Sequence, residues 1–262
     1  MNNNILIDTH SHLYDEEFDK DIDEVISRAI SANVKKCILP GIDSTYFDRI
    51  IKFSQKYPEF AYPAIGLHPT SVAKNWKEEL DFVKNNIDKY KFYAIGEIGL
   101  DGYWSKEFME EQKNVFKEQI ILSVEKNLPI IIHLREANEE LFEVFNSLDT
   151  ETQNNMRGVF HAYSGSFETY ERIKKYGNFK FGIGGVLTYK NASIAKALEH
   201  IKLEDMLLET DCPWLTPVPH RGKRNESSYI PIIANKIAEI KNCSIDDIAS
   251  ATSNNAIKLF KI

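Results

Sequence analysis

The chain alternates short apolar runs with longer stretches in which apolar residues recur at helical spacing. Several of the short runs lack the strict alternation of apolar and polar residues, as expected for strands buried on both faces of a parallel sheet. The pattern therefore predicts eight strands, which lie at Ile5–Asp8, Cys37–Leu39, Phe60–Leu67, Tyr93–Glu97, Pro129–His133, Gly158–His161, Phe179–Ile183 and Met206–Glu209.

Amphipathic stretches fill the intervals between these runs. Within Asp21–Ser31, the apolar residues Ile22, Val25 and Ala29 fall on one face of a helix. The same spacing predicts further helices at Lys106–Asn127, Glu136–Leu148 and Ser193–His200.

This order of strands and helices predicts an α/β fold, a TIM-type (β/α)8 barrel that forms one domain over residues 1–262. The rival fold is an open doubly wound sheet, which carries a glycine-rich turn after its first strand. Here the first strand ends in DTHSH (8–12) instead, and no low-complexity linker interrupts the chain. The closed barrel is therefore favoured.

Composition excludes several classes of protein. Hydrophobic residues make up 43% of the chain, which excludes intrinsic disorder. With 32 basic and 39 acidic residues the net charge is −7, so contact with a polyanion must be local or mediated by metal ions. The cysteines Cys37, Cys212 and Cys243 lie far apart and predict neither a disulfide framework nor a thiolate zinc site.

No apolar run reaches membrane-spanning length, so we expect no membrane association. The opening residues MNNNILIDTH lack the basic and apolar regions of a secretory signal. A cytoplasmic location is therefore expected, and nothing in the pattern demands an obligate protein partner.

Polar residues gather where the predicted strands end. The C-terminal ends of barrel strands meet at one rim, so residues that are distant in sequence can share a site there. Each such residue alone could be a loop residue, half of an ion pair or a buried structural histidine, but their common position favours one site. The residues at these ends are His10, His12, His68, Glu97, His133, His161 and Asp211.

Most of this set suits divalent metal ions, because it mixes imidazole nitrogens with carboxylate oxygens. Six ligands are too many for a single catalytic ion that keeps an open position, but they suit two ions bridged by Glu97. The predicted ligands are His10, His12, Glu97, His133, His161 and Asp211.

Two basic features remain open to more than one interpretation. The segment His220–Asn225 is the most basic cluster of the chain, and it predicts either a solvated loop or a phosphate-binding loop near the rim. Arg135, two residues after His133, could also bind phosphate, or it could pair with a carboxylate.

The motifs that carry these residues run from Asp8 to near Phe260. They are DTHSHL (8–13), GLHP (66–69), GEIGLD (96–101), HLREA (133–137), FHAYSG (160–165), ETDCPWLTP (209–217) and RGKRNE (221–226). In order and spacing the chain resembles the TatD family of metal-dependent deoxyribonucleases, within the amidohydrolase-like superfamily. The family often has a second histidine where this chain has Thr70, and a phenylalanine in place of Tyr163.

The resemblance implies a barrel that hydrolyses DNA phosphodiester bonds, as an exonuclease, with two divalent ions (Mg, Mn, Zn or Ni). It implies a contact of His68 with the scissile phosphate, an orienting role for Glu209, and a substrate-side loop that contains Arg221 and Asn225. The implied ligands are His10, His12, Glu97 and Asp211 for one ion, and Glu97, His133 and His161 for the other.

The expected mechanism is in-line attack on phosphorus by a metal-held water, with Asp211, Glu97 and His68 as catalytic residues. A hydrolase of the same superfamily acting on an amide, ester or lactone is the first alternative, together with a deacylase acting on aminoacyl-tRNA. A metal-binding scaffold without catalysis is the second alternative.

Overall fold

The computed structural model describes residues 5–262 of the chain. Each of the eight predicted strands is present, although several begin or end at other residues than expected. The strands are β1 (Leu6–Asp8), β2 (Val34–Leu39), β3 (Ala61–Pro63), β4 (Ile95–Asp101), β5 (Ile130–Arg135), β6 (Arg157–Phe160), β7 (Asn178–Ile183) and β8 (Met206–Leu208).

These parallel strands close into a barrel. Strands β1–β2–β3 form one sheet and β4 to β8 form a second. The bridge between Ile65 and Ile95 joins the two sheets on one side. On the other side the backbone N–H of Thr9 donates to the carbonyl of Leu208 at 2.9 Å. The predicted TIM-type (β/α)8 barrel is therefore confirmed.

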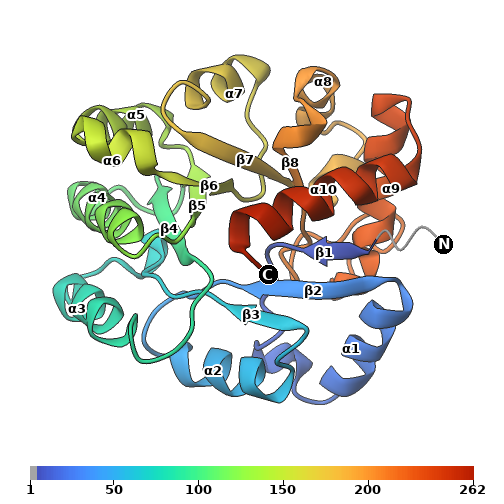
Figure 1. The fold of residues 1–262 in the computed structure, drawn as a ribbon, viewed down its shortest axis with the longest axis horizontal. Helices are drawn as coiled ribbons and strands as arrows, with labels where there is room; N and C mark the ends of the chain where they lie inside the picture. Colours follow the sequence, from blue (N-terminus) through green and yellow to red (C-terminus); the bar gives the residue numbers. More distant parts are fainter. Residues whose placement is uncertain (1–4) are drawn as a thin grey trace.

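Helices surround the barrel, which Figure 1 views along its axis. The four helices predicted from the sequence are confirmed as α1, α4, α5 and α8, each slightly shorter than expected. The α-helices are α1 (Ile22–Ser31), α2 (Phe47–Lys56), α3 (Trp76–Asn86), α4 (Met109–Glu125), α5 (Asn138–Asn146), α6 (Thr150–Asn155), α7 (Phe167–Ile173), α8 (Ile194–His200), α9 (Ile230–Lys241) and α10 (Ile245–Phe260). Short 3-10 helices lie at Glu16–Phe18, Pro69–Ser71, Gly185–Thr188, Leu203–Asp205 and Ser227–Tyr229.

Strand β4 differs most from its prediction. It was expected to end at Glu97, but it continues to Asp101 because Asp101 still pairs with Arg135 of β5. Strand β3 is shorter than expected, since it ends at Pro63 and the apolar residues after it form only the single bridge at Ile65.

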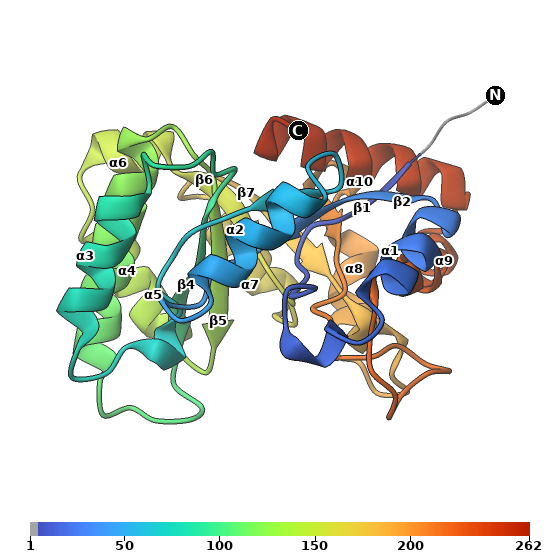
Figure 2. The same ribbon diagram turned by 90° about the horizontal axis from the view of Figure 1, so that it is seen from below.

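The interior of the barrel is a packed core. Helix α10 crosses one end of the barrel (Figure 1), and its residues Leu259 and Phe260 join the interior cluster. Long loops project from the opposite end (Figure 2), where the strands finish. No helix among residues 5–262 is long and apolar enough to span a bilayer. The strand residues of the interior cluster are Ile7, Ile38, Tyr62, Ile131, Val159 and Leu207.

Candidate metal centre

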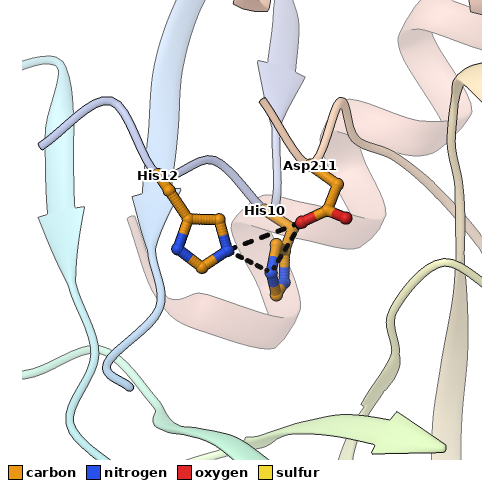
Figure 3. A group of neighbouring side chains, drawn as sticks. All are labelled: His10, His12 and Asp211. Carbon is orange, nitrogen blue, oxygen red and sulfur yellow. Dashed lines mark hydrogen bonds and ion pairs between the residues drawn. The ribbon is translucent and has the colours of Figure 1, made fainter. Parts of the chain in front are cut away.

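One part of the site joins the chain after β1 to the chain after β8. The Nε2 atoms of His10 and His12 lie 3.2 Å apart. Asp211 Oδ1 lies 3.5 Å from both of these nitrogens, and Figure 3 shows the three side chains converging. Asp211 has a left-handed backbone with φ 58°, a conformation that aspartate adopts more readily than most residues. Three of the six predicted ligands, His10, His12 and Asp211, therefore face a common point.

Glu97 on β4 connects this group to the other ligands. Its Oε2 lies 3.1 Å from His10 Nε2, while its Oε1 lies 3.0 Å from His133 Nδ1 and 2.7 Å from His161 Nε2. Burial raises the pKa of Glu97, but the imidazoles of His161, His68 and His10 outweigh burial and hold that pKa well below its usual range. Glu97 is therefore a buried carboxylate that stays ionised.

The residues fit divalent cations. The site contains three groups of residues, and within each group the ligand atoms lie within 4.8 Å of one another. Glu97 belongs to two of these groups. The buried Nδ1 atoms of His10 and His161 have no hydrogen-bond partner. At this spacing, the lone pairs of two imidazole nitrogens repel each other unless a proton or a cation lies between them. The same holds for the lone pairs of an imidazole nitrogen and a carboxylate oxygen. The three groups are His10–His12–Asp211, His10–Glu97–His161 and His68–Glu97–His133.

Tyr14 sets the tautomer of His12. The Tyr14 hydroxyl donates to the carbonyl of Pro40 at 2.6 Å, so its oxygen must accept from His12 Nδ1–H, 2.8 Å away. This leaves the lone pair of His12 on Nε2, which is the atom that faces Asp211.

Asp101 sets the opposite tautomer in His133. Asp101 Oδ2 lies 2.8 Å from His133 Nε2, so this nitrogen carries the proton and donates it to the carboxylate. The lone pair of His133 is then on Nδ1, which faces Glu97 and His161. A hydrogen bond from a carboxylate to a ligand histidine also raises the basicity of that ligand.

His68 differs from the other histidines of the site. The backbone N–H of Thr70 donates to His68 Nδ1 at 3.1 Å, so Nδ1 is the acceptor. The proton of the neutral ring is therefore on Nε2, which points at Glu97 Oε1 at 3.2 Å. His68 thus offers a hydrogen-bond donor to the centre, whereas His12 and His133 offer lone pairs.

Glu209 lies beside His161, on the side of that ring that faces away from Glu97. It is fully buried, its Oε1 accepts from the backbone N–H of Ala162, and the same oxygen lies 3.8 Å from His161 Nδ1. Burial raises the pKa of Glu209 to about 8. A Cβ at Gly182 would lie 1.8 Å from Glu209 Oε2, so the strand beside this carboxyl must carry glycine.

Asp8 ties the ends of β1 and β8 together. Its carboxylate accepts from the backbone N–H of Thr210 at 2.9 Å, from the Thr210 hydroxyl at 2.6 Å and from the Ser227 hydroxyl at 2.6 Å. Burial raises the pKa of Asp8 to about 6 in spite of these bonds. This network fixes the strand ends that carry His10 and Asp211.

A cavity of about 470 Å³ opens over these ligands at the C-terminal ends of the strands. It gives a small molecule or a chain end access to Glu97, His161 and Asp211. Aromatic side chains form much of its remaining wall, namely Tyr14, Tyr46, Trp104 and Trp214.

Besides His68, three residues were expected near the substrate, and they occupy different places. Arg135 lines the cavity. Arg221 lies on the exposed loop after β8, where its guanidinium is 4.6 Å from the ring centre of Tyr189. Asn225 is fully buried, and its side-chain amide donates to the carbonyls of Thr210 and Trp214. Asn225 therefore fixes the loop that follows Asp211.

The sequence model of the TatD-related DNase family matches residues 7–261. The chain belongs to this family. A metal-dependent hydrolase of Bacillus subtilis, YabD, described as uncharacterized, is 41% identical over 259 residues, 98% of this chain and 100% of that protein. Human deoxyribonuclease TATDN3 is 31% identical over 269 residues, 97% of this chain and 94% of that protein.

A solved TatD structure has the same fold. The crystal structure of the TatD homologue YjjV of Escherichia coli superposes with a TM-score of 0.90 and 29% identity, and each chain is covered completely. The resemblance drawn from the motifs is thus confirmed, and this TatD protein is a metal-dependent hydrolase.

Sequence reasoning missed two residues of the TatD site that orient histidines. Asp101 ends the GEIGLD motif, and because alternate residues of a strand share a face, it lies on the same side of β4 as Glu97. Tyr14 lies two residues after His12, so the same spacing could have linked them.

Proposed function

We propose that this TatD protein hydrolyses phosphodiester bonds of DNA with two divalent ions. The observation that carries the proposal is the position of Glu97, whose Oε2 faces His10 while its Oε1 faces His133 and His161. A carboxylate that presents one oxygen to each of two histidine groups is suited to bridging two cations. One ion would be held by His10, His12, Glu97 and Asp211, and the other by Glu97, His133 and His161.

Divalent ions, when bound, lower the pKa of water and neutralise charge on a phosphoryl group. Asp211 accepts the proton of the water that attacks phosphorus. Burial raises the pKa of Asp211, but the neighbouring imidazoles of His12, His10 and His161 outweigh burial and hold that pKa below its ordinary value. An ionised carboxylate beside the attacking water is the state that general-base catalysis requires.

Other side chains act on the phosphate itself. His68 Nε2–H is directed into the centre and donates to a phosphate oxygen as negative charge develops there. Arg135 and Arg221 bind flanking phosphates, which gives an acidic chain a local attraction for DNA. Glu209 places a buried carboxyl 3.8 Å from Nδ1 of His161, and Asn225 holds the loop after Asp211 in place.

The names of relatives support DNA as the substrate, since human TATDN3 is described as a deoxyribonuclease. The test combines metal analysis of the purified protein with cleavage of end-labelled single-stranded and double-stranded DNA. The protein is first stripped with a chelator and then supplied separately with Mg²⁺, Mn²⁺, Zn²⁺ or Ni²⁺. We expect cleavage to disappear on stripping and return with metal, and products that shorten stepwise from one end would identify an exonuclease.

The same preparation is assayed on amide, ester and lactone substrates and on aminoacyl-tRNA. Metal-restored turnover of one of these substrates without turnover of DNA would replace the proposal with the alternative hydrolase. Bound metal with no turnover on any substrate would favour a scaffold without catalysis.

A further inference from the structure

We propose that Tyr103, Trp104 and Arg135 form an aromatic subsite that stacks an unpaired nucleobase of the substrate beside the metal centre. The inference deepens the proposed function and rests on it. It names which side chains of this protein recognise the part of the nucleic acid next to the scissile phosphate.

The first observation is the exposure of the two aromatic rings. Trp104 is 71% exposed and Tyr103 is 48% exposed, although both are large side chains that proteins usually bury. They lie in the loop between β4 and α4, which projects from the same end of the barrel as the loop that follows β8 (Figure 2). Exposed apolar surface that adjoins a functional cavity marks a site of interaction.

The second observation is the geometry of the three side chains. The rings of Tyr103 and Trp104 meet edge to face with their centres 5.0 Å apart. The guanidinium of Arg135 lies 3.5 Å from the ring centre of Tyr103 and 5.7 Å from that of Trp104. Arg135 forms no ion pair with any carboxylate of residues 5–262, so its charge is available to a phosphate while its plane remains stacked.

The third observation is that the subsite is anchored to the metal centre. Asp101 Oδ1 accepts from the backbone N–H groups of Tyr103 at 2.9 Å and Trp104 at 3.1 Å. The other carboxylate oxygen of Asp101 holds His133. One buried side chain therefore fixes both the loop and a ligand, which gives the rings a defined place relative to the scissile bond.

Trp104 also lines the cavity that contains Glu97, and Trp214, which is 49% exposed, lines the same cavity. Aromatic rings bind bases of any sequence by stacking, because every base presents a flat face. A base inside a duplex already stacks on both neighbours and has no free face for Trp104, whereas an unpaired base can present one. The occupant to which the proposal commits is therefore an unpaired base whose phosphate reaches Arg135.

The test compares wild-type protein with Trp104→Ala, Tyr103→Ala and the matched control Tyr90→Ala, an aromatic residue that is 42% exposed in the segment that leads into β4. The probe is a labelled single-stranded oligonucleotide with phosphorothioate linkages, titrated by fluorescence anisotropy with the metal ion present. We expect Trp104→Ala to weaken binding about 5- to 20-fold, within the range measured for the loss of one stacked base. Tyr90→Ala should match the wild type.

A second arm uses cleavable oligonucleotides with one abasic residue moved along the strand. At one position the missing base should lower wild-type kcat/KM by a similar factor of about 5 to 20, while Trp104→Ala is indifferent to it. Equal behaviour of Trp104→Ala, Tyr103→Ala and Tyr90→Ala in both arms would overturn the inference.

The two proposals fail separately. If the wild type cleaves no DNA, the proposed function fails, and the anisotropy arm still decides the inference. If sedimentation shows an oligomer that Trp104→Ala dissociates while oligonucleotide binding is unchanged, the rings belong to a contact between copies of the chain and the inference is overturned.

Discussion

The two ends of the barrel each bury a carboxylate, but they satisfy it in opposite ways. At the end covered by α10, Asp205 accepts from Lys174 at 2.7 Å, from Lys180 at 3.3 Å and from the Tyr170 hydroxyl at 2.8 Å. At the open end, every basic group paired with Glu97 among residues 5–262 is an imidazole. Lysine carries its own charge at neutral pH, whereas neutral histidine does not.

This difference in partners indicates that Asp205 contributes to stability and Glu97 to function. The charge of Asp205 is compensated by Lys174 and Lys180 of the same chain, so its contacts stabilise the fold without a bound cation. Glu97 is paired with imidazoles, and the lone pair that His133 directs toward it complements a cation from outside the chain. The three buried side-chain polar atoms without a hydrogen bond among residues 5–262 all lie at the open end, and they belong to His10, His161 and Glu209.

The largest expected effect is at the open end. Asp211→Asn keeps the shape of the side chain but removes the acceptor for a proton, so we expect kcat to fall about 10²- to 10⁴-fold. The measurement is cleavage of a labelled oligonucleotide at saturating metal, with circular dichroism to verify folding. Full activity in this variant would remove Asp211 from the mechanism.

The next effect is at the closed end. Asp205→Asn leaves two lysines without their carboxylate, so we expect a loss of about 2–4 kcal/mol in the free energy of unfolding, with kcat unchanged. Urea unfolding measures the loss. As a control, Asp23→Asn breaks the exposed pair with Lys56 and should cost less than about 1 kcal/mol.

The pH dependence of Asp205 sharpens this prediction. Burial raises the pKa of Asp205, but Lys174 and Tyr170 outweigh burial and hold that pKa below its ordinary value. The contribution of a carboxylate with a depressed pKa is complete above the unfolded pKa and is lost as pH falls through the folded pKa. The stability gap between wild type and Asp205→Asn should therefore be constant above about pH 5 and shrink below about pH 4. A gap that is independent of pH would contradict the pairing.

A smaller effect is expected where a tyrosine orients a ligand. Tyr14→Phe removes the acceptor for His12 Nδ1–H and frees the tautomer of that ring, so metal affinity should fall about 10- to 100-fold. Competition with a chromogenic chelator measures the affinity. Tyr176→Phe, which removes a hydroxyl bonded to Asn146 on the surface, serves as the control. Equal metal affinities in the two variants would show that the Tyr14 hydroxyl is not needed to orient His12.

Much of the barrel was predictable because its strands are short, apolar and regularly spaced. The positions of His133, His161 and Asp211 followed from the rule that barrel strands end at one rim. Strand ends were harder to predict, since the end of β4 depends on pairing with β5. The expected end at Glu97 therefore left Asp101 outside the predicted strand.

Tautomers and loop contacts could not be predicted from the sequence. The proton of His133 is placed by Asp101 and that of His68 by Thr70, and both depend on side-chain positions that the fold creates. The stacking of Arg135 on Tyr103 joins residues about thirty positions apart, and no periodic pattern links them.

The carboxylate of Asp101 connects the metal centre to the loop between β4 and α4. Since one oxygen holds the ring of His133 and the other holds the backbone of the loop, displacement of either partner strains the bond to the other. At equilibrium such linkage is reciprocal, so a ligand bound on the loop and a metal ion bound in the centre change each other's binding affinity by the same factor.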